Sequence, residues 1–150
     1  MIVLLDSGPL GILSNPNSSP TVQAYQIWAE ELIIKKYEII VPEIADYEVR
    51  RELLRANKQS GLRRLDRLKI RFQYLPLTTE TMLKAAEFWA EARRSGKPTA
   101  SPDALDGDVI LAAQAYLIAE EVVDRTTVVI ATTNVNHLER FAIAKHWQNI

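Results

Sequence analysis

The chain has 150 residues, of which 47% are hydrophobic and 25% charged, a composition typical of one globular domain, here expected over residues 1–150. It has no cysteine, which excludes a disulfide framework, a zinc ribbon, a thiol nucleophile and an iron–sulfur site. No apolar run reaches membrane-span length and no basic region precedes the apolar start, so we expect a cytoplasmic protein. The net charge of −1, taken alone, argues against a protein that binds polyanions.

Short apolar runs alternate along the chain with longer helical patterns. In chain order we expect strand Ile2–Leu5, helix Thr21–Lys35, strand Glu38–Val41, helices Glu43–Asn57 and Gln59–Leu68, strand Phe72–Leu75, helices Thr79–Ser95 and Asp106–Glu121, and strand Thr127–Ala131. Continuous apolar strands of this kind suit a parallel sheet that is covered on both faces. The predicted fold is therefore α/β, a three-layer α/β/α sandwich with a central parallel sheet of about four to five strands.

The near-zero net charge conceals an uneven distribution of charged residues. Between Arg50 and Arg71 there are nine basic and two acidic residues, so this segment carries +7 and the rest of the chain −8. A cationic segment of this density indicates a solvated helical face, a protein-docking surface or a surface for a phosphate backbone.

Polar residues follow the first and the last predicted strands. Asp6 ends the run Ile2–Leu5, and Thr132, Thr133 and Asn134 follow the last strand. Sites in open parallel sheets gather at the carboxyl ends of the strands. Asp6 is thus a site candidate, although capping a short helix that begins near Pro9 explains it equally well.

Two further segments place carboxylates near apolar helices. Asp108 opens the very apolar helix Val109–Ala119, with Asp103 and Asp106 close before it; helix capping needs only one of these three acids. Glu48 lies within the second helix, where a surface ion pair with Arg51 is the simpler explanation for a lone acid.

Carboxylates that converge repel one another, and each has a raised pKa unless a divalent cation lies between them. An oxygen-only donor set, with no cysteine and two histidines distant in sequence, favours Mg²⁺ or Mn²⁺ over zinc.

Five segments occur in an order and at a spacing that point to a known family: Ile2–Ser7, Val41–Arg50, Leu75–Thr78, Asp108–Ala115 and Ala131–Leu138. Together they resemble the PIN-domain family, most closely the VapC-like ribonuclease toxins of type II toxin–antitoxin pairs. The resemblance implies a PIN-like fold, hydrolysis of RNA with Mg²⁺ or Mn²⁺, a cognate antitoxin as partner, and a homodimer.

Carried over by position, the resemblance makes Asp6, Glu48 and Asp108 the catalytic, metal-binding acids. Asn134 falls where the family often has a fourth acid, so it is a candidate ligand that supplies no charge. His137 stands where the family commonly has Asp, and Leu138 replaces an aromatic residue.

Around the expected ligands, Ser7, Asp106 and Thr132 are candidates to orient the carboxylates through hydrogen bonds, although capping explains Ser7 and Thr132 equally well. Because bare carboxylates repel RNA, cations nearby have to attract the substrate. The candidates are two arginine clusters, the second continued by Lys97: Arg50, Arg51 and Arg55, then Arg93 and Arg94. Antitoxin docking is the alternative use of the first cluster.

Three other functions compete with a nuclease. A PIN fold that binds nucleic acid or acts as a scaffold, with weak or no catalysis, is favoured by the missing acid at Asn134. Phosphotransfer through an aspartyl nucleophile would want a further acid close behind Asp6, and Ser7–Leu10 has none. A nucleotide-binding Rossmann domain lacks its glycine-rich motif after the first strand.

Overall fold

The computed structural model describes residues 1–96, 102–123 and 126–150, and at residues 102–104 the backbone alone. Lys97 and the side chain of Asp103, both named above, lie outside the described residues.

Five parallel strands form one sheet in the order β3-β2-β1-β4-β5. Their bounds are Ile2–Leu5 for β1, Glu38–Pro42 for β2, Gln73–Leu75 for β3, Val128–Thr132 for β4 and Ala144–His146 for β5. The inner strands β1 and β4 are buried along their whole length, as their apolar sequences require of a sheet covered on both faces. The chain moves outward from β1 in both directions, so the topological switch point lies between β1 and β4.

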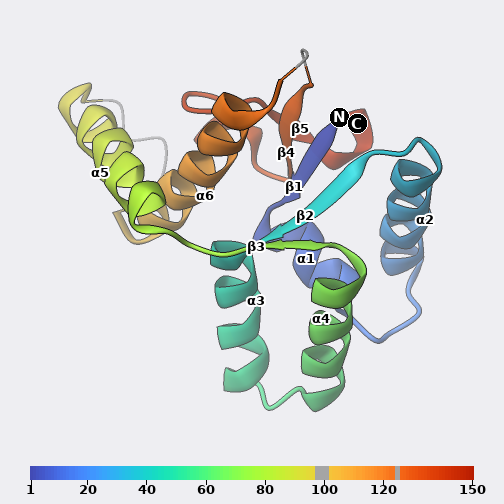
Figure 1. The fold of residues 1–150 in the computed structure, drawn as a ribbon. Helices are drawn as coiled ribbons and strands as arrows, with labels where there is room; N and C mark the ends of the chain where they lie inside the picture. Colours follow the sequence, from blue (N-terminus) through green and yellow to red (C-terminus); the bar gives the residue numbers. More distant parts are fainter. Residues whose placement is uncertain (97–101, 124–125) are drawn as a thin grey trace.

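Helices α1 (Ser7–Leu13), α2 (Pro20–Ile34), α3 (Glu43–Arg55) and α4 (Gln59–Arg71) contribute to the core on one face of the sheet. Val3 and Leu5 of β1 point into this core, where they join Leu10, Leu32 and Leu65. Figure 1 shows α3 and α4 running side by side away from the sheet, as a helical hairpin below it.

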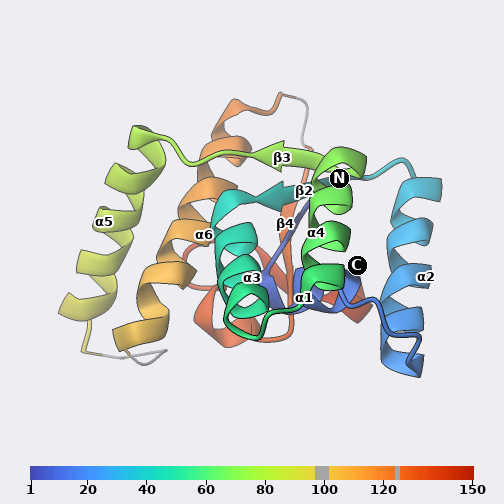
Figure 2. The same ribbon diagram turned by 90° about the horizontal axis from the view of Figure 1, so that it is seen from below.

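The other face is covered by α6 (Pro102–Glu121), and α5 (Thr79–Arg94) packs on α6. The alternate residues of β1, Ile2 and Leu4, point to this side and meet Leu111. In Figures 1 and 2 α5 is the outermost element beyond α6. None of the helices within the described ranges is long and apolar enough to cross a membrane.

The α/β sandwich and its parallel sheet are confirmed, and the four predicted strands match β1–β4 to within one residue at each end. Two differences have local causes. The edge strand β5, Ala-Lys-His, has no apolar run that would reveal it. Helix α6 begins four residues before the predicted start, at Pro102, because proline is well tolerated in a first helical turn.

Candidate active site

Asp6 lies at the carboxyl end of β1, beside the switch point. Its backbone N–H donates to the carbonyl of Ala131 at 3.0 Å, which continues the pairing of β1 with β4. One carboxylate oxygen, Oδ1, accepts the backbone N–H of Ser7 at 2.7 Å and so caps α1. The other, Oδ2, accepts the Thr132 hydroxyl at 2.7 Å. Both explanations of Asp6 therefore hold: it caps a helix, and it presents a positioned carboxylate at the sheet edge.

Thr132 links this carboxylate to the turn after β4. Its side chain is fully buried, and its hydroxyl oxygen accepts the backbone N–H of Asn134 at 2.9 Å while the hydroxyl donates to Asp6. Ser7 contributes chiefly its backbone, because its hydroxyl is 3.5 Å from Asp6. The predicted orienting role is thus carried by Thr132 more than by the Ser7 side chain.

Glu48 reaches the same region from α3. A Cβ atom added to Gly107 of α6 would lie 3.1 Å and 3.2 Å from the two carboxylate oxygens of Glu48, so the carboxylate lies against the backbone next to Asp108. Burial raises the pKa of Glu48, the Asp6 carboxylate raises it further, Arg51 lowers it and Asp108 raises it again. Three acids far apart in sequence therefore act on one another across the site.

Asp108 is the most perturbed acid of the three. Burial raises its pKa to about 6; His137 opposes this shift and Asp6 adds to it. Its Oδ2 atom is buried and makes no hydrogen bond. Nδ1 of His137 lies 3.3 Å from that oxygen, without the alignment of a hydrogen bond. Either a bound cation or a protonated His137 would satisfy this oxygen.

His137 is distant from the acids in sequence, but the fold brings its Nδ1 atom to 3.3 Å from Oδ2 of Asp108. The short 3₁₀ helix η1 (Val135–His137) carries its imidazole back to the sheet edge, where Asn134 Nδ2 lies 2.9 Å from Nδ1. The spacing of three residues between Asn134 and His137, directly after a strand that pairs with β1, was the available signal. The imidazole therefore lies beside the candidate carboxylates.

Asp106 is not part of this site, in contrast to its predicted orienting role. It is exposed and lines a hollow between α5 and α6 together with Met82 and Trp89. Residues two apart on a helix point to different faces, so a side chain at position 106 diverges from Asp108.

Two other acids of α3 already have partners within the chain. Asp46 is buried and pairs with Arg50 at 2.9 Å and with Lys69 at 3.4 Å. Glu43 accepts the backbone N–H of Leu77 and thereby fixes the loop after β3.

The predicted RNA-contacting arginines occupy different environments. Arg50 is engaged by Asp46 and also by Asp66 at 2.7 Å, so its guanidinium has a structural role. Arg51 stacks on Tyr47, with 5.2 Å between guanidinium and ring centre, and lines a hollow beside Glu48. Arg55 pairs with the exposed Glu52. Of the first cluster, Arg51 is the member at the carboxylates.

Arg93 and Arg94 lie in the last turn of α5, and Arg93 stacks on Trp89 at 5.4 Å. Both are exposed and belong to the α5 side of the molecule, on the helix that packs outside α6. The structure therefore does not bring them together with Arg51 in one hollow.

The hollow beside Glu48 has a volume of about 380 Å³, and its other lining residues include Ser7, Gly8 and Gly11. It shares Gly11 and Leu53 with a neighbouring hollow of about 520 Å³, which extends over the loop between α3 and α4. Side-chain amides and one cation line this second hollow: Asn15, Asn17, Asn57, Gln59 and Lys58. The two hollows form a polar track that leads away from the carboxylates.

The donor set fits a divalent cation: Asp6 is held in place, Glu48 and Asp108 have raised pKa values, and Asp108 Oδ2 has no donor. Among the side chains that the structure describes, no three acidic or histidine residues already converge closely enough to hold an ion together. A cation here would accordingly keep several waters, as Mg²⁺ commonly does.

A protein-family comparison decides the family. The model described as "PIN domain" matches residues 18–134, more than half of the chain. The chain belongs to the PIN-domain family. The match begins after Asp6, so the placement of Asp6 depends on the structure. No curated protein matches the sequence.

Solved structures share this PIN fold over nearly the whole chain. VapBC2 from Rickettsia felis, bound to a DNA fragment from its promoter, has a TM-score of 0.73 at 19% identity and covers 98% of this chain and 99% of that one. FitAcB from Neisseria gonorrhoeae has a TM-score of 0.70 at 18% identity. VapBC-1 from nontypeable Haemophilus influenzae has a TM-score of 0.67 at 17% identity, and both matches cover 99% of each chain. These likenesses confirm the fold and agree with the resemblance to VapC-like proteins.

Proposed function

We propose that this PIN-domain protein is a metal-dependent endoribonuclease and the toxin of a toxin–antitoxin pair. The proposal is supported by the electrostatic coupling of three acids from distant segments: Asp6 and Asp108 both raise the pKa of Glu48, and Asp6 raises that of Asp108. The Glu48 carboxylate also lies against the α6 backbone at Gly107, next to Asp108. Asp46, which stabilises the fold, is paired with two cations, whereas burial and neighbouring acids keep the pKa values of Glu48 and Asp108 raised.

In the mechanism, Asp6, Glu48 and Asp108 are the residues that would hold Mg²⁺ or Mn²⁺, and the ion would supply activation of water and charge stabilisation at the phosphate. Thr132 and the Ser7 N–H fix both oxygens of Asp6, so that this carboxylate needs no reorientation during the reaction. Arg51 lies beside Glu48 and offers a guanidinium to a phosphate of the RNA.

The polar track gives the RNA a path. A single strand that enters beside Glu48 and Arg51 would continue past Gly11 toward Lys58 and the amides of Asn57 and Gln59. Amide side chains can hydrogen-bond to the edges of unpaired bases, and Lys58 can contact the backbone.

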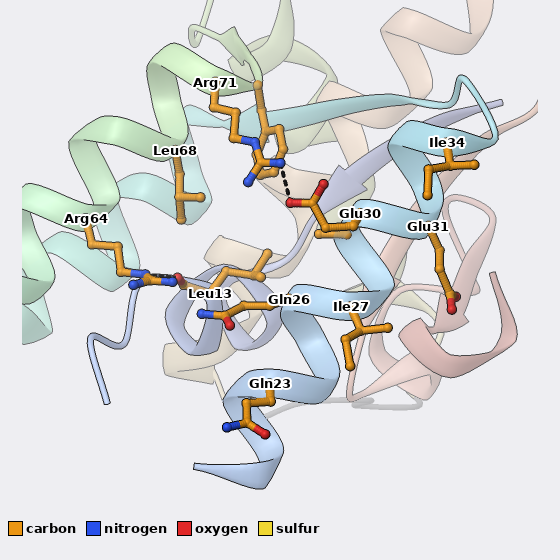
Figure 3. Close-up of a pocket in the computed structure, with 12 residues that line it drawn as sticks. Leu13, Gln23, Gln26, Ile27, Glu30, Glu31, Ile34, Arg64, Leu68 and Arg71 are labelled. Atoms are coloured by element: carbon orange, nitrogen blue, oxygen red, sulfur yellow. Dashed lines mark hydrogen bonds and ion pairs between the residues drawn. The ribbon is translucent and has the colours of Figure 1, made fainter. Parts of the chain in front are cut away.

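An antitoxin is supported by the two-component names of the similar structures. A groove of about 640 Å³ between α2 and α4 is the surface that we assign to it (Figure 3). Ile27 and Ile34 are 60% and 78% exposed along this groove, and Arg71 and Glu30 form an ion pair across it. An amphipathic antitoxin helix would bury these isoleucines and meet the charges at the rim.

The expected homodimer stays a prediction, which light scattering tests.

One observation favours the second candidate, a PIN fold that binds nucleic acid without cleaving it. The Asn134 side chain is directed to His137 and supplies no negative charge to the site. Such a protein would bind RNA equally well with and without divalent cations.

The test is cleavage of single-stranded RNA by the purified protein with Mn²⁺, Mg²⁺ or EDTA. We expect cleavage that depends on the cation and falls by on the order of 10²–10³-fold in Asp6→Asn and Asp108→Asn. Asp106→Asn is the matched control, because it removes an exposed acid of the same helix, and it should cleave normally. A wild type that is inert with each cation, yet binds RNA, would reject the nuclease in favour of the binding protein.

A further inference from the structure

The ring of Tyr47 is the most exposed aromatic side chain of the protein. Its exposed fraction is 56%, whereas Tyr25 and Phe72 are buried in the core at 2% and 7%. Tyr47 lies on α3 and is followed directly by Glu48, one of the three candidate acids. A single exposed aromatic residue is ordinary on a protein surface, so its role depends on what surrounds the ring.

Arg51 connects the Tyr47 ring to the candidate active site. It lies one helical turn after Tyr47 and places its guanidinium carbon over the ring, 5.2 Å from the ring centre. The same side chain lines the hollow beside Glu48. Burial and Asp6 raise the pKa of Glu48, and Arg51 lowers it, so the guanidinium also acts on this carboxylate.

The charge of Arg51 is not used within the described part of the chain. Arg50 and Arg55, its neighbours on α3, form ion pairs with Asp46 and Glu52, but no acid of residues 1–96, 105–123 or 126–150 forms one with Arg51. The guanidinium is therefore available to an anion that enters the hollow beside Glu48.

The pair of Tyr47 and Arg51 matches the two parts of a nucleotide. A nucleotide joins an anionic phosphate to a flat base through one ribose. A guanidinium suits the phosphate, and an aromatic ring suits the face of the base. Bases within a duplex are already paired and stacked on their neighbours, so only an unpaired base is free to cover the ring.

We propose that Tyr47 and Arg51 form a platform that holds one unpaired nucleotide beside the carboxylates and so restricts the enzyme to single-stranded RNA. The base stacks on the Tyr47 ring, and its phosphate is contacted by Arg51. The proposal rests on the proposed function and adds the residue that selects unpaired over paired RNA.

A second arginine–aromatic pair in the chain provides a matched control. Arg93 lies over the Trp89 ring at 5.4 Å, and Trp89 is 40% exposed, so the two pairs are similar in geometry and exposure. Trp89 lines the hollow between α5 and α6, on the outer side of α6. Exposure and a nearby arginine alone would make both rings bind RNA, whereas the proposal assigns binding to Tyr47.

The test measures stacking under conditions that prevent metal-dependent cleavage. The full chain in EDTA is mixed with a short unstructured RNA that carries 2-aminopurine, whose fluorescence falls on stacking, at one position at a time. The same strand annealed to its complement is the duplex probe. We expect fluorescence quenching and tight binding with the single strand, and neither with the duplex.

Variants assign the stacking to the ring. In Tyr47→Leu, which keeps an apolar side chain, quenching should vanish and the affinity for the single strand should fall by about 5–100-fold, with Tm unchanged because the residue is exposed. Tyr47→Phe and Trp89→Leu should bind as the wild type does. With Mn²⁺ the loss in Tyr47→Leu should appear in KM more than in kcat, since the ring touches the RNA before and during the reaction alike.

The outcomes separate this inference from the proposed function. Quenching and affinity that persist in Tyr47→Leu overturn the platform, even if the wild type cleaves RNA. A Tyr47→Leu variant that binds RNA normally but has half the wild-type mass by light scattering also overturns it, because the ring then lies between two copies of the chain. Equal affinity for single strand and duplex overturns the selection of unpaired RNA. A wild type that stacks the base through Tyr47 yet cleaves with neither Mn²⁺ nor Mg²⁺ overturns the nuclease and leaves the platform.

Discussion

Helix α3 contributes one acid to each of two charged groups that the fold treats in opposite ways. Asp46 is buried between Arg50 and Lys69, which neutralise it within the chain. Glu48, two residues further, faces Asp6 and Asp108, which raise its pKa in addition to burial. The first group stabilises the hairpin of α3 and α4; the second is left without enough internal positive charge.

The difference shows what distinguishes a structural carboxylate from a functional one. A buried acid costs free energy, and the protein can offset this cost with its own cations or leave the offset to a ligand. Where internal cations are present, as at Asp46, ligand binding is not needed. Where they are insufficient, as at Asp108, burial of the carboxylate is not fully offset within the chain and its pKa is raised.

The largest expected effect is at the neutralised group. Asp46→Asn leaves Arg50 and Lys69 without their buried, charged partner. The side chains of both are only about a quarter exposed. We expect the free energy of unfolding to fall by about 2–3 kcal/mol, measured by urea denaturation. Mn²⁺ affinity should stay at the wild-type value, and a variant that lost cation binding while remaining folded would remove the distinction between the two groups.

At Asp108 the change from Asp to Asn should have the opposite effect on the free energy of unfolding. Without divalent cations at pH 7.5, Asp108→Asn removes a carboxylate whose ionisation is penalised by burial. Because solvent still reaches part of this side chain, we expect a gain of about 1–2 kcal/mol in the free energy of unfolding. The variant should also lose the stabilisation that Mn²⁺ gives the wild type, seen as a shift in Tm. Asp106→Asn should change neither quantity, and a destabilised Asp108→Asn would contradict the comparison.

The stability of the metal-free protein should depend on pH through Asp108. Its pKa is about 6 in the folded chain against an ordinary value of 3.8, so the folded state holds this proton more tightly. The resulting stability is fully present below about pH 4 and is lost as the pH rises through about 6. In EDTA, the difference in Tm between the wild type and Asp108→Asn should therefore be smallest at pH 4 and grow toward pH 7. Parallel curves over this range would show that Asp108 titrates normally.

The smallest effect is expected from Gly107→Ala. The new Cβ would stand 3.1 Å from Oε2 of Glu48 and push its flexible end aside. Alanine favours the helix by up to about 1 kcal/mol, so folding should be unharmed while Mn²⁺ affinity falls by at most about tenfold. Gly11→Ala is the control, since its Cβ would make an ordinary contact of 3.7 Å with Val49. Unchanged affinity in Gly107→Ala would place Glu48 outside the cation site.

The sequence predicts most of the fold because the inner strands are apolar on both faces and the helices have clear patterns. It does not reveal β5, whose three residues are held by pairing with β4 at the sheet edge. The position of Asp6 can be predicted from topology, because an acid directly after an inner strand must lie at the carboxyl edge of the sheet.

Side-chain direction and local turns are where the sequence fails. Asp106 and Asp108 are near neighbours along the chain, yet only Asp108 faces the other acids. His137 looks isolated, but η1 turns it back toward Asp108. Arg50 and Arg51 are adjacent, and α3 commits Arg50 to Asp46 while Arg51 reaches Glu48. Each outcome depends on a rotation about a helix axis or a turn, which composition and spacing do not determine.

The pairing of β1 with β4 has a consequence for synthesis of the chain. Asp6 is made first, but its carboxylate is held by Thr132, which is translated 126 residues later. An edge assembled from contacts of such long range forms late in folding. A nascent chain that still lacks β4 would therefore lack the hydrogen bond that holds the Asp6 carboxylate at the sheet edge, and this edge would acquire its geometry only after β4, near the end of the chain, has been made.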